Sequence, residues 1–235
     1  MAIVAGADGC GGGWICVTLD TETGVLASGL YGNAGALVHQ VPTPAILMVD
    51  IPIGLTQEQG RVCDEQARGL LGPRHVCVFP APIRPALHEP NREEAARINR
   101  DADGRGVGAQ AWAIYPKIRE MDEAVGGEGG NLQNRVFEVH PEVSFREWNG
   151  QTPIPHGKRT ARGKAQRQGL LAGFFGDNAF RNVRGRYIVG QVGDDDITDA
   201  FAALWTARRR LAGAALCIPA EPPVDGRGLR MEMWY

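Results

Sequence analysis

Four aspartates occur at positions where folding would bring them together. Asp8 closes an apolar run at the N-terminus, and Asp50 closes a second apolar run. Asp196 and Asp199 are spaced to lie along one side of a predicted amphipathic helix. Carboxylates that meet at one end of a sheet repel each other, and a divalent cation removes that repulsion. The pattern therefore indicates metal-dependent phosphoryl chemistry.

Local structure offers an alternative explanation for each aspartate. Asp8 and Asp50 are both followed by turn signals, and aspartate favours turns because its carboxylate accepts hydrogen bonds from nearby backbone. Asp196 and Asp199 lie near the start of a helix, where the macrodipole stabilises acidic side chains. One of the two aspartates before Asp196 would then be the helix N-cap. The macrodipole explains one acid better than it explains several in a row.

A glutamate in an apolar strand is a fifth candidate. Glu138 lies within the strand predicted at 135–139 and needs a partner or solvent there. Alternation along the strand places it opposite to Phe137, either on an exposed face or with the aspartates. His140 is either a general base or a hydrogen-bonded structural histidine.

A cationic segment precedes the last part of the chain. Lys158, Arg159, Arg162 and Lys164 are predicted to hold the phosphates of a nucleic acid. The alternative is a solvated face of the helix predicted at 158–175. The sequence alone does not decide between them.

Composition limits the classes of function. The chain has 235 residues and a net charge of -2, so attraction for nucleic acid must come from a local basic patch. Its 43% hydrophobic and 22% charged residues are typical of a globular protein with a sizeable core. Five cysteines without a Cys-x-x-Cys pair favour reduced thiols and a cytoplasmic location. We expect no signal peptide and no membrane span.

Strands and tight turns dominate the first fifty residues. The pattern predicts strands at 2–7, 14–19 and 25–31, joined by glycine-rich turns into an antiparallel meander. The strongly apolar stretch at 45–51 is predicted to be a central strand covered on both faces. If this strand lies parallel to the first, Asp8 and Asp50 meet at the same edge.

The sequence pattern predicts that the rest of the chain is mostly helical. Residues 56–132 are predicted to form a mainly helical insertion that ends in a flexible glycine-rich joint at 126–130. A strand or extended segment is expected at 187–192, and a final long helix at 196–212. The whole of 1–235 is predicted to be a single domain around the insertion.

The order of these features resembles the ribonuclease-H-like superfamily. The segment 196–202 is similar to the closing acidic motif of Holliday-junction resolvases. More closely, nearly the whole chain resembles domain-of-unknown-function family 429, a family of predicted ribonuclease-H-like nucleases. The likeness is carried by segments 6–10 with Gly13 and Trp14, 49–55, 61–68, 78–82, 138–142 and 195–200.

The resemblance implies an α/β fold: a ribonuclease-H-like mixed five-stranded sheet, with an antiparallel meander and parallel strands, flanked by helices. It implies that Asp8, Asp50, Asp196 and Asp199 bind Mg²⁺ or Mn²⁺, with Glu138 as a further catalytic residue. The leading hypothesis is thus a metal-dependent nuclease that hydrolyses the phosphodiester bonds of DNA or RNA.

The sequence is also compatible with two other functions. An actin- or sugar-kinase-like phosphotransferase or ATPase shares the strand order, although such enzymes usually duplicate the fold. A non-catalytic nucleic-acid-binding module would keep the fold and bind without turnover. The oligomeric state is open as well, with a homodimer as one alternative.

Overall fold

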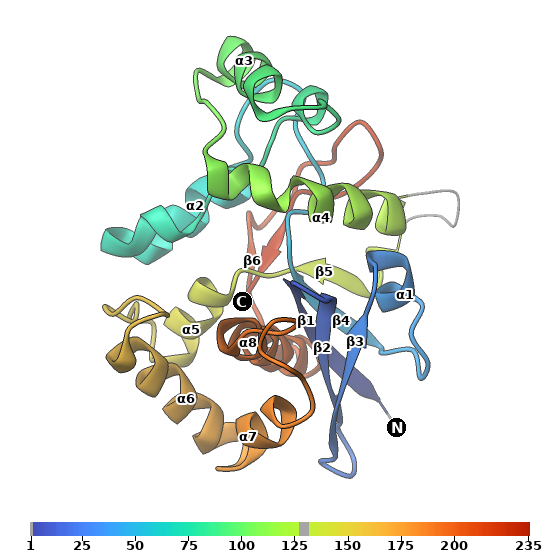
Figure 1. Cartoon of the computed structure of the whole chain (residues 1–235), viewed down its shortest axis with the longest axis vertical. Helices are drawn as coiled ribbons and strands as arrows, with labels where there is room; N and C mark the ends of the chain where they lie inside the picture. The colour runs from blue at the N-terminus through green and yellow to red at the C-terminus, as the bar shows by residue number, and fades with distance from the viewer. Residues whose placement is uncertain (1, 127–131) are drawn as a thin grey trace.

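The computed structural model describes residues 2–126 and 132–235, and a mixed five-stranded sheet lies at the centre of this part (Figure 1). The strand order is β3-β2-β1-β4-β5. The first three strands form the antiparallel meander, whereas β4 and β5 run parallel to β1. The mixed α/β sheet predicted from the sequence is therefore confirmed. Its strands are β1 (Ile3–Cys10), β2 (Gly13–Asp20), β3 (Leu26–Tyr31), β4 (Ile46–Asp50) and β5 (Val136–Glu138).

Helices cover both faces of this sheet. In Figure 1, α2, α3 and α4 lie in the upper half of the picture and α5 to α8 in the lower half. The helices are α1 (Ala34–Val38), α2 (Val62–Leu71), α3 (Arg92–Asp103), α4 (Ala109–Gly126), α5 (Pro141–Trp148), α6 (Ala161–Phe175), α7 (Ala179–Arg184) and α8 (Asp194–Leu211), with short 3-10 turns η1 (Gly72–Cys77) and η2 (Arg84–Ala86). The strands β6 (Cys217–Ile218) and β7 (Met233–Trp234) form a separate small pair.

The two-residue period of β1 divides the core into two layers. Ala5 and Ala7 pack with α1 and α4 on one face, whereas Val4 packs with α5 to α8 on the other. In β4, Met48 lies on the same face as Val4. Because successive side chains alternate, Asp8 and Asp50 point toward the α8 side of the sheet.

Helix α8 lies against strand β1 with very little space between them. Gly6 lies at the contact, and a Cβ atom there would overlap the backbone of Ala200 and Leu204. The helix presents small buried residues at this point, including Ala200 and Ala203. This close approach fixes the height of α8 over the sheet and brings Asp199, next to Ala200, to the edge where Asp8 lies.

The region predicted as an insertion is helical. Among the described residues of 56–132 the structure contains α2, η1, η2, α3 and α4 and no strand. Gly126 ends α4, whereas the rest of the predicted glycine-rich joint lies outside the described residues.

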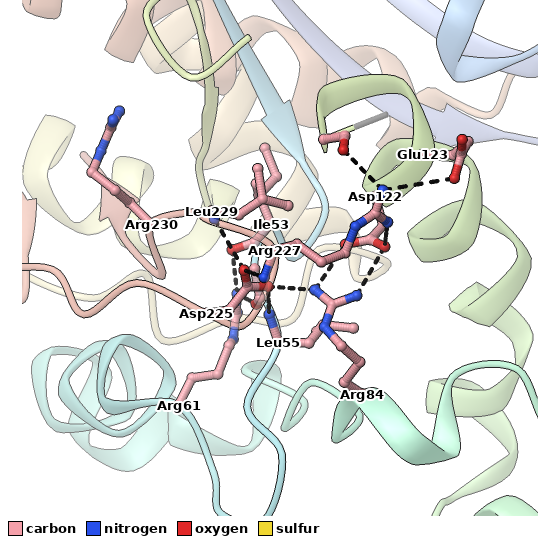
Figure 2. Close-up of polar contacts among 12 residues, drawn as sticks. Ile53, Leu55, Arg61, Arg84, Asp122, Glu123, Asp225, Arg227, Leu229 and Arg230 are labelled. Atoms are coloured by element: carbon pink, nitrogen blue, oxygen red, sulfur yellow. Dashed lines mark hydrogen bonds and ion pairs between the residues drawn. The ribbon is translucent and has the colours of Figure 1, made fainter. Parts of the chain in front are cut away.

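A network of four charged side chains joins this region to the C-terminal tail, as Figure 2 shows. Arg84 donates to both carboxylate oxygens of Asp122 at 3.0 Å and also pairs with Asp225. Arg227 pairs with Asp122 from the tail. The backbone N–H of Leu55 donates to Asp225 at 3.0 Å. The tail therefore holds α4 and the loop after β4 in fixed positions.

Three local expectations are corrected by the structure. Strand β1 continues past Asp8 to Cys10, so the turn falls at 11–12. Residues 187–192 form turns rather than a strand. The final helix begins at Asp194, with Gly193 as its N-cap, because the Asp196 carboxylate accepts a 2.8 Å hydrogen bond from the Gly193 N–H.

Candidate metal centre

Three of the predicted aspartates lie together at one edge of the sheet. Asp8 and Asp50 are direct register partners on the parallel strands β1 and β4. Asp199 approaches from α8. One carboxylate oxygen from each of the three lies within 4.8 Å of the others. The sequence argument placed Asp8 and Asp50 side by side, and the structure has them there.

Lys158 supplies a positive charge to this cluster, which we name the acidic triad (Asp8, Asp50 and Asp199). Its Nζ lies 2.6 Å from Oδ2 of Asp199. The Asp199 charge is the largest cause of a raised Lys158 pKa, and Asp8 and Asp50 add to it. Lys158 therefore stays protonated, and its ammonium compensates part of the triad's negative charge.

The single ammonium of Lys158 does not keep the pKa values of the triad carboxyl groups in their ordinary range. Burial raises the pKa of Asp50 to about 7, although Lys158 opposes the shift. Burial likewise raises the pKa of Asp199 to about 6, against Lys158 and with help from the Asp50 charge. The pKa of Asp8 is raised well above its ordinary value by burial first, then by the charges of Asp50 and Asp199. The site thus holds more carboxyl groups than its one ammonium can keep ionised.

The donor set suits a hard divalent cation. Carboxylate oxygens are the ligands that Mg²⁺ takes in proteins, usually one or two carboxylates together with water and substrate phosphate. Burial is the first cause of the raised pKa values of Asp8, Asp50 and Asp199, and a cation among them would stabilise their ionised form. The residues present therefore fit such an ion.

Asp196 lies beside the acidic triad but has a different local role. Its carboxylate caps the start of α8 through Gly193, and it does not belong to the group whose oxygens lie within 4.8 Å. Burial raises its pKa as well. It lines the same cavity as Asp8, so it faces the site without joining the triad.

Glu138 is buried on the other face of the sheet, so it is neither exposed nor beside the aspartates, the two positions left open by the sequence. It is only 2% exposed, and its neighbour Val136 packs with the α4 side. Arg61 donates to both of its oxygens at 2.7 Å and also pairs with Asp64. The Ile53 N–H donates to it as well. Strand alternation thus separates Glu138 from the acidic triad.

The basic segment divides into two parts. Lys158 and Arg159 line the cavity, and Arg159 pairs loosely with Asp195 at 3.8 Å. Arg162 is exposed on α6, and Lys164 lies 3.7 Å from Asp194, away from the cavity lining. Lys158, which is predicted to bind nucleic acid, lies at the acidic triad.

A cavity of about 660 Å³ opens onto the acidic triad. It runs between the sheet edge and the helical region, with the 72–79 segment and α4 on one side. Buried acids form its floor, because Asp8, Glu138 and Asp199 are nearly inaccessible. Exposed residues mark its mouth: Val76, Phe79, Gln110, Ala113 and Arg159.

Several polar residues that line this cavity are not among the site residues predicted from the sequence. Arg61 and Asp64 belong to the 61–68 segment, and Glu142 belongs to the 138–142 segment, so the resemblance contained a signal for them. Glu142 is held by Arg167 at 2.6 Å. His140 caps α5, where it accepts from the Glu142 N–H, and burial lowers its pKa.

The sheet order, the flanking helices and the acids at the shared end of β1 and β4 define a protein with a ribonuclease-H-like α/β fold. Comparison with protein families matches residues 6–224 to the family described as Protein of unknown function (DUF429). The chain belongs to this family. No curated protein and no solved structure matched it. None of the helices in residues 2–126 and 132–235 combines the length and apolar character needed to cross a bilayer.

Proposed function

We propose that the protein is a metal-dependent nuclease that hydrolyses phosphodiester bonds of nucleic acid. The observation that carries the proposal is the acidic triad, whose three carboxylate oxygens lie within 4.8 Å of one another at the floor of a cavity. Buried, mutually repelling carboxylates are costly to keep in a folded protein unless they serve a charged ligand. Mg²⁺ or Mn²⁺ with a phosphate group matches that requirement.

Each member of the site has a role in this proposal. Asp8, Asp50 and Asp199 would hold the cation, and Asp196 would face it from the first turn of α8. When bound, the metal would activate water and stabilise the leaving oxygen. Lys158 holds Asp199 in place and presents an ammonium to a phosphate oxygen that enters the site. Glu138 would act indirectly, since Arg61 occupies both its oxygens.

Activity loss in single aspartate variants tests the proposal. Asp8→Asn and Asp50→Asn should each lower Mn²⁺-dependent cleavage of structured DNA and RNA by more than about 100-fold, beyond the 10–100-fold typical of losing an outer-shell partner. Asp177→Asn is the matched control, because Asp177 is exposed and does not line the cavity. Metal-dependent cleavage that persists unchanged in both site variants would refute the proposal.

The two alternative functions make different predictions in the same experiments. A phosphotransferase or ATPase would be stabilised against heat by a nucleotide with Mg²⁺ and would release phosphate from it. A non-catalytic module would bind nucleic acid without turnover, and Asp→Asn changes would leave its affinity intact or raise it, because a negative charge near the phosphates is lost.

A further inference from the structure

An aromatic side chain at the mouth of the cavity is only partly buried by the rest of the protein. Phe79 is 45% exposed and lines the cavity that leads to the acidic triad. Val76, from the same 72–79 segment, is 60% exposed beside it. An exposed aromatic at the entrance to a phosphate-directed site offers a flat surface on which a nucleobase can stack.

An arginine on the same segment has no anionic partner in the described part of the chain. Among the described residues, no hydrogen bond or ion pair engages the Arg74 guanidinium, and its Nε is buried without a partner. Arg61 and Arg167 differ, since the guanidinium of each forms an ion pair with a buried carboxylate. Arg74 is therefore a cation available to an anion that enters the cavity.

The cavity is too narrow for a double helix. A cube of 660 Å³ has an edge of about 9 Å, whereas the major groove of DNA alone is roughly 12 Å wide. A volume in this range encloses a ligand of nucleotide size. The helical region forms one wall of the cavity, and the Arg84–Asp225 and Asp122–Arg227 pairs fix it to the tail. Phosphates of an intact duplex would have to pass this wall to reach the buried acids.

We propose that the cavity binds unpaired nucleotides of a single strand, with a base on Phe79 and a phosphate between Arg74 and the acidic triad. Enzymes that act inside narrow pockets take a nucleotide out of the duplex or use single-stranded substrate. The inference rests on the proposed function only in taking the bound strand as the one that is cut. It applies to DNA and RNA alike, since stacking and phosphate contacts recognise both.

Binding of labelled oligonucleotides tests this inference. Fluorescence anisotropy would compare ten-nucleotide oligo(dT) and oligo(U) with a blunt DNA duplex, using Ca²⁺ as the cation and checking on a gel that the probe stays intact. We expect the single strands to bind at least about tenfold more tightly. Phe79→Ala should weaken single-strand binding about 5- to 140-fold, whereas Phe79→Trp keeps the stacking surface and should keep the affinity.

Matched controls separate the subsite from general surface effects. Phe174→Ala removes a phenylalanine of similar exposure, 48%, that does not line the cavity, and should leave the affinity unchanged. Arg74→Gln should flatten the slope of log affinity against log salt by about 0.7, the contribution of one phosphate contact in a single strand. Arg186→Gln, an exposed arginine away from the cavity lining, should not.

Two results would overturn the inference: duplex bound as tightly as single strands, or equal losses for Phe79→Ala and Phe174→Ala. The proposed function is judged apart, by Mn²⁺-dependent hydrolysis of bis(p-nitrophenyl) phosphate, which carries no base. If the protein hydrolyses this compound but shows no preference for single strands, the proposed subsite is refuted and the proposed hydrolase activity stands. If the protein prefers single strands but hydrolyses nothing, the proposed hydrolase activity is refuted and the proposed subsite stands.

Discussion

The ammonium of Lys158 lies 2.6 Å from the carboxylate of Asp199, although 41 residues separate them in the chain. This contact gives the acidic triad its one positive neighbour among the ion pairs of the described residues. It also means that the basic segment contributes to the site itself and not only to its surroundings.

Lys158→Met should destabilise the metal-free protein because the triad loses its compensating charge. The expected loss is about 1–2 kcal/mol, less than for a fully buried pair, since the Lys158 side chain is 40% exposed. Mn²⁺ should then raise the melting temperature more in Lys158→Met than in the wild type. Urea unfolding in EDTA measures the first effect. The control is Lys164→Met, whose 3.7 Å pair is solvent-exposed on both sides; equal losses in the two variants would contradict the assigned role.

Stability without metal should fall as pH rises from about 4 to about 7. A carboxyl group with a pKa near 3.9 in the unfolded chain and about 7 at Asp50 or about 6 at Asp199 in the folded state binds more protons when folded. The folded state therefore loses relative stability across that window. Urea midpoints in EDTA at pH 5 and pH 8 measure the fall. Asp50→Asn should make it smaller, and an identical fall in that variant would count against the raised pKa.

Gly6→Ala should weaken metal binding without changing any ligand. The added Cβ would overlap the backbone of α8 at Ala200 and Leu204 and push the helix, with Asp199, away from β1. We expect a loss of several kcal/mol in stability, as for overpacking against an unyielding backbone. Gly169→Ala on α6 meets no atom within 4 Å and should be neutral or stabilising. Normal Mn²⁺ affinity in Gly6→Ala would show that the α8 contact does not position the triad.

Arg61→Met should be among the most destabilising single changes in the chain. It leaves the buried carboxylates of Asp64 and Glu138 without their shared partner, at a cost of about 3–5 kcal/mol. Arg97→Met, which removes an exposed helix-surface pair with Glu94, should leave the urea midpoint unchanged. A small effect for Arg61→Met would mean that the network tolerates two unpaired acids.

The sequence predicted the features that depend on local pattern. The apolar runs before Asp8 and Asp50 identified two buried strands, whereas their parallel pairing was a condition of the argument that the structure meets. The helical spacing placed Asp196 and Asp199 on one side of the last helix, and Asp199 lies with Asp8 and Asp50 in the structure. These signals repeat every two or three to four residues, so a single sequence contains them.

Contacts between distant segments could not be predicted in the same way. Glu138 meets Arg61 across 77 residues, and no periodicity in the strand specifies such a partner. The helical region that covers β5 buries Glu138. The strand pattern alone was equally consistent with a solvent-exposed side chain. The start of α8 was placed two residues late, because an aspartate at the first turn was read as a cap when Gly193 fills that position.

Calorimetric titration with Mn²⁺ tests most directly whether the acidic triad is a cation site. The wild type should show saturable binding, and Asp8→Asn should weaken it at least about tenfold, since even the loss of an outer-shell partner costs that much. Asp8→Asn should remain folded, because it removes a source of repulsion from Asp50 and Asp199. Asp177→Asn serves as the control and should titrate like the wild type. Equal Mn²⁺ binding by the wild type and Asp8→Asn, or none by either, would contradict the account.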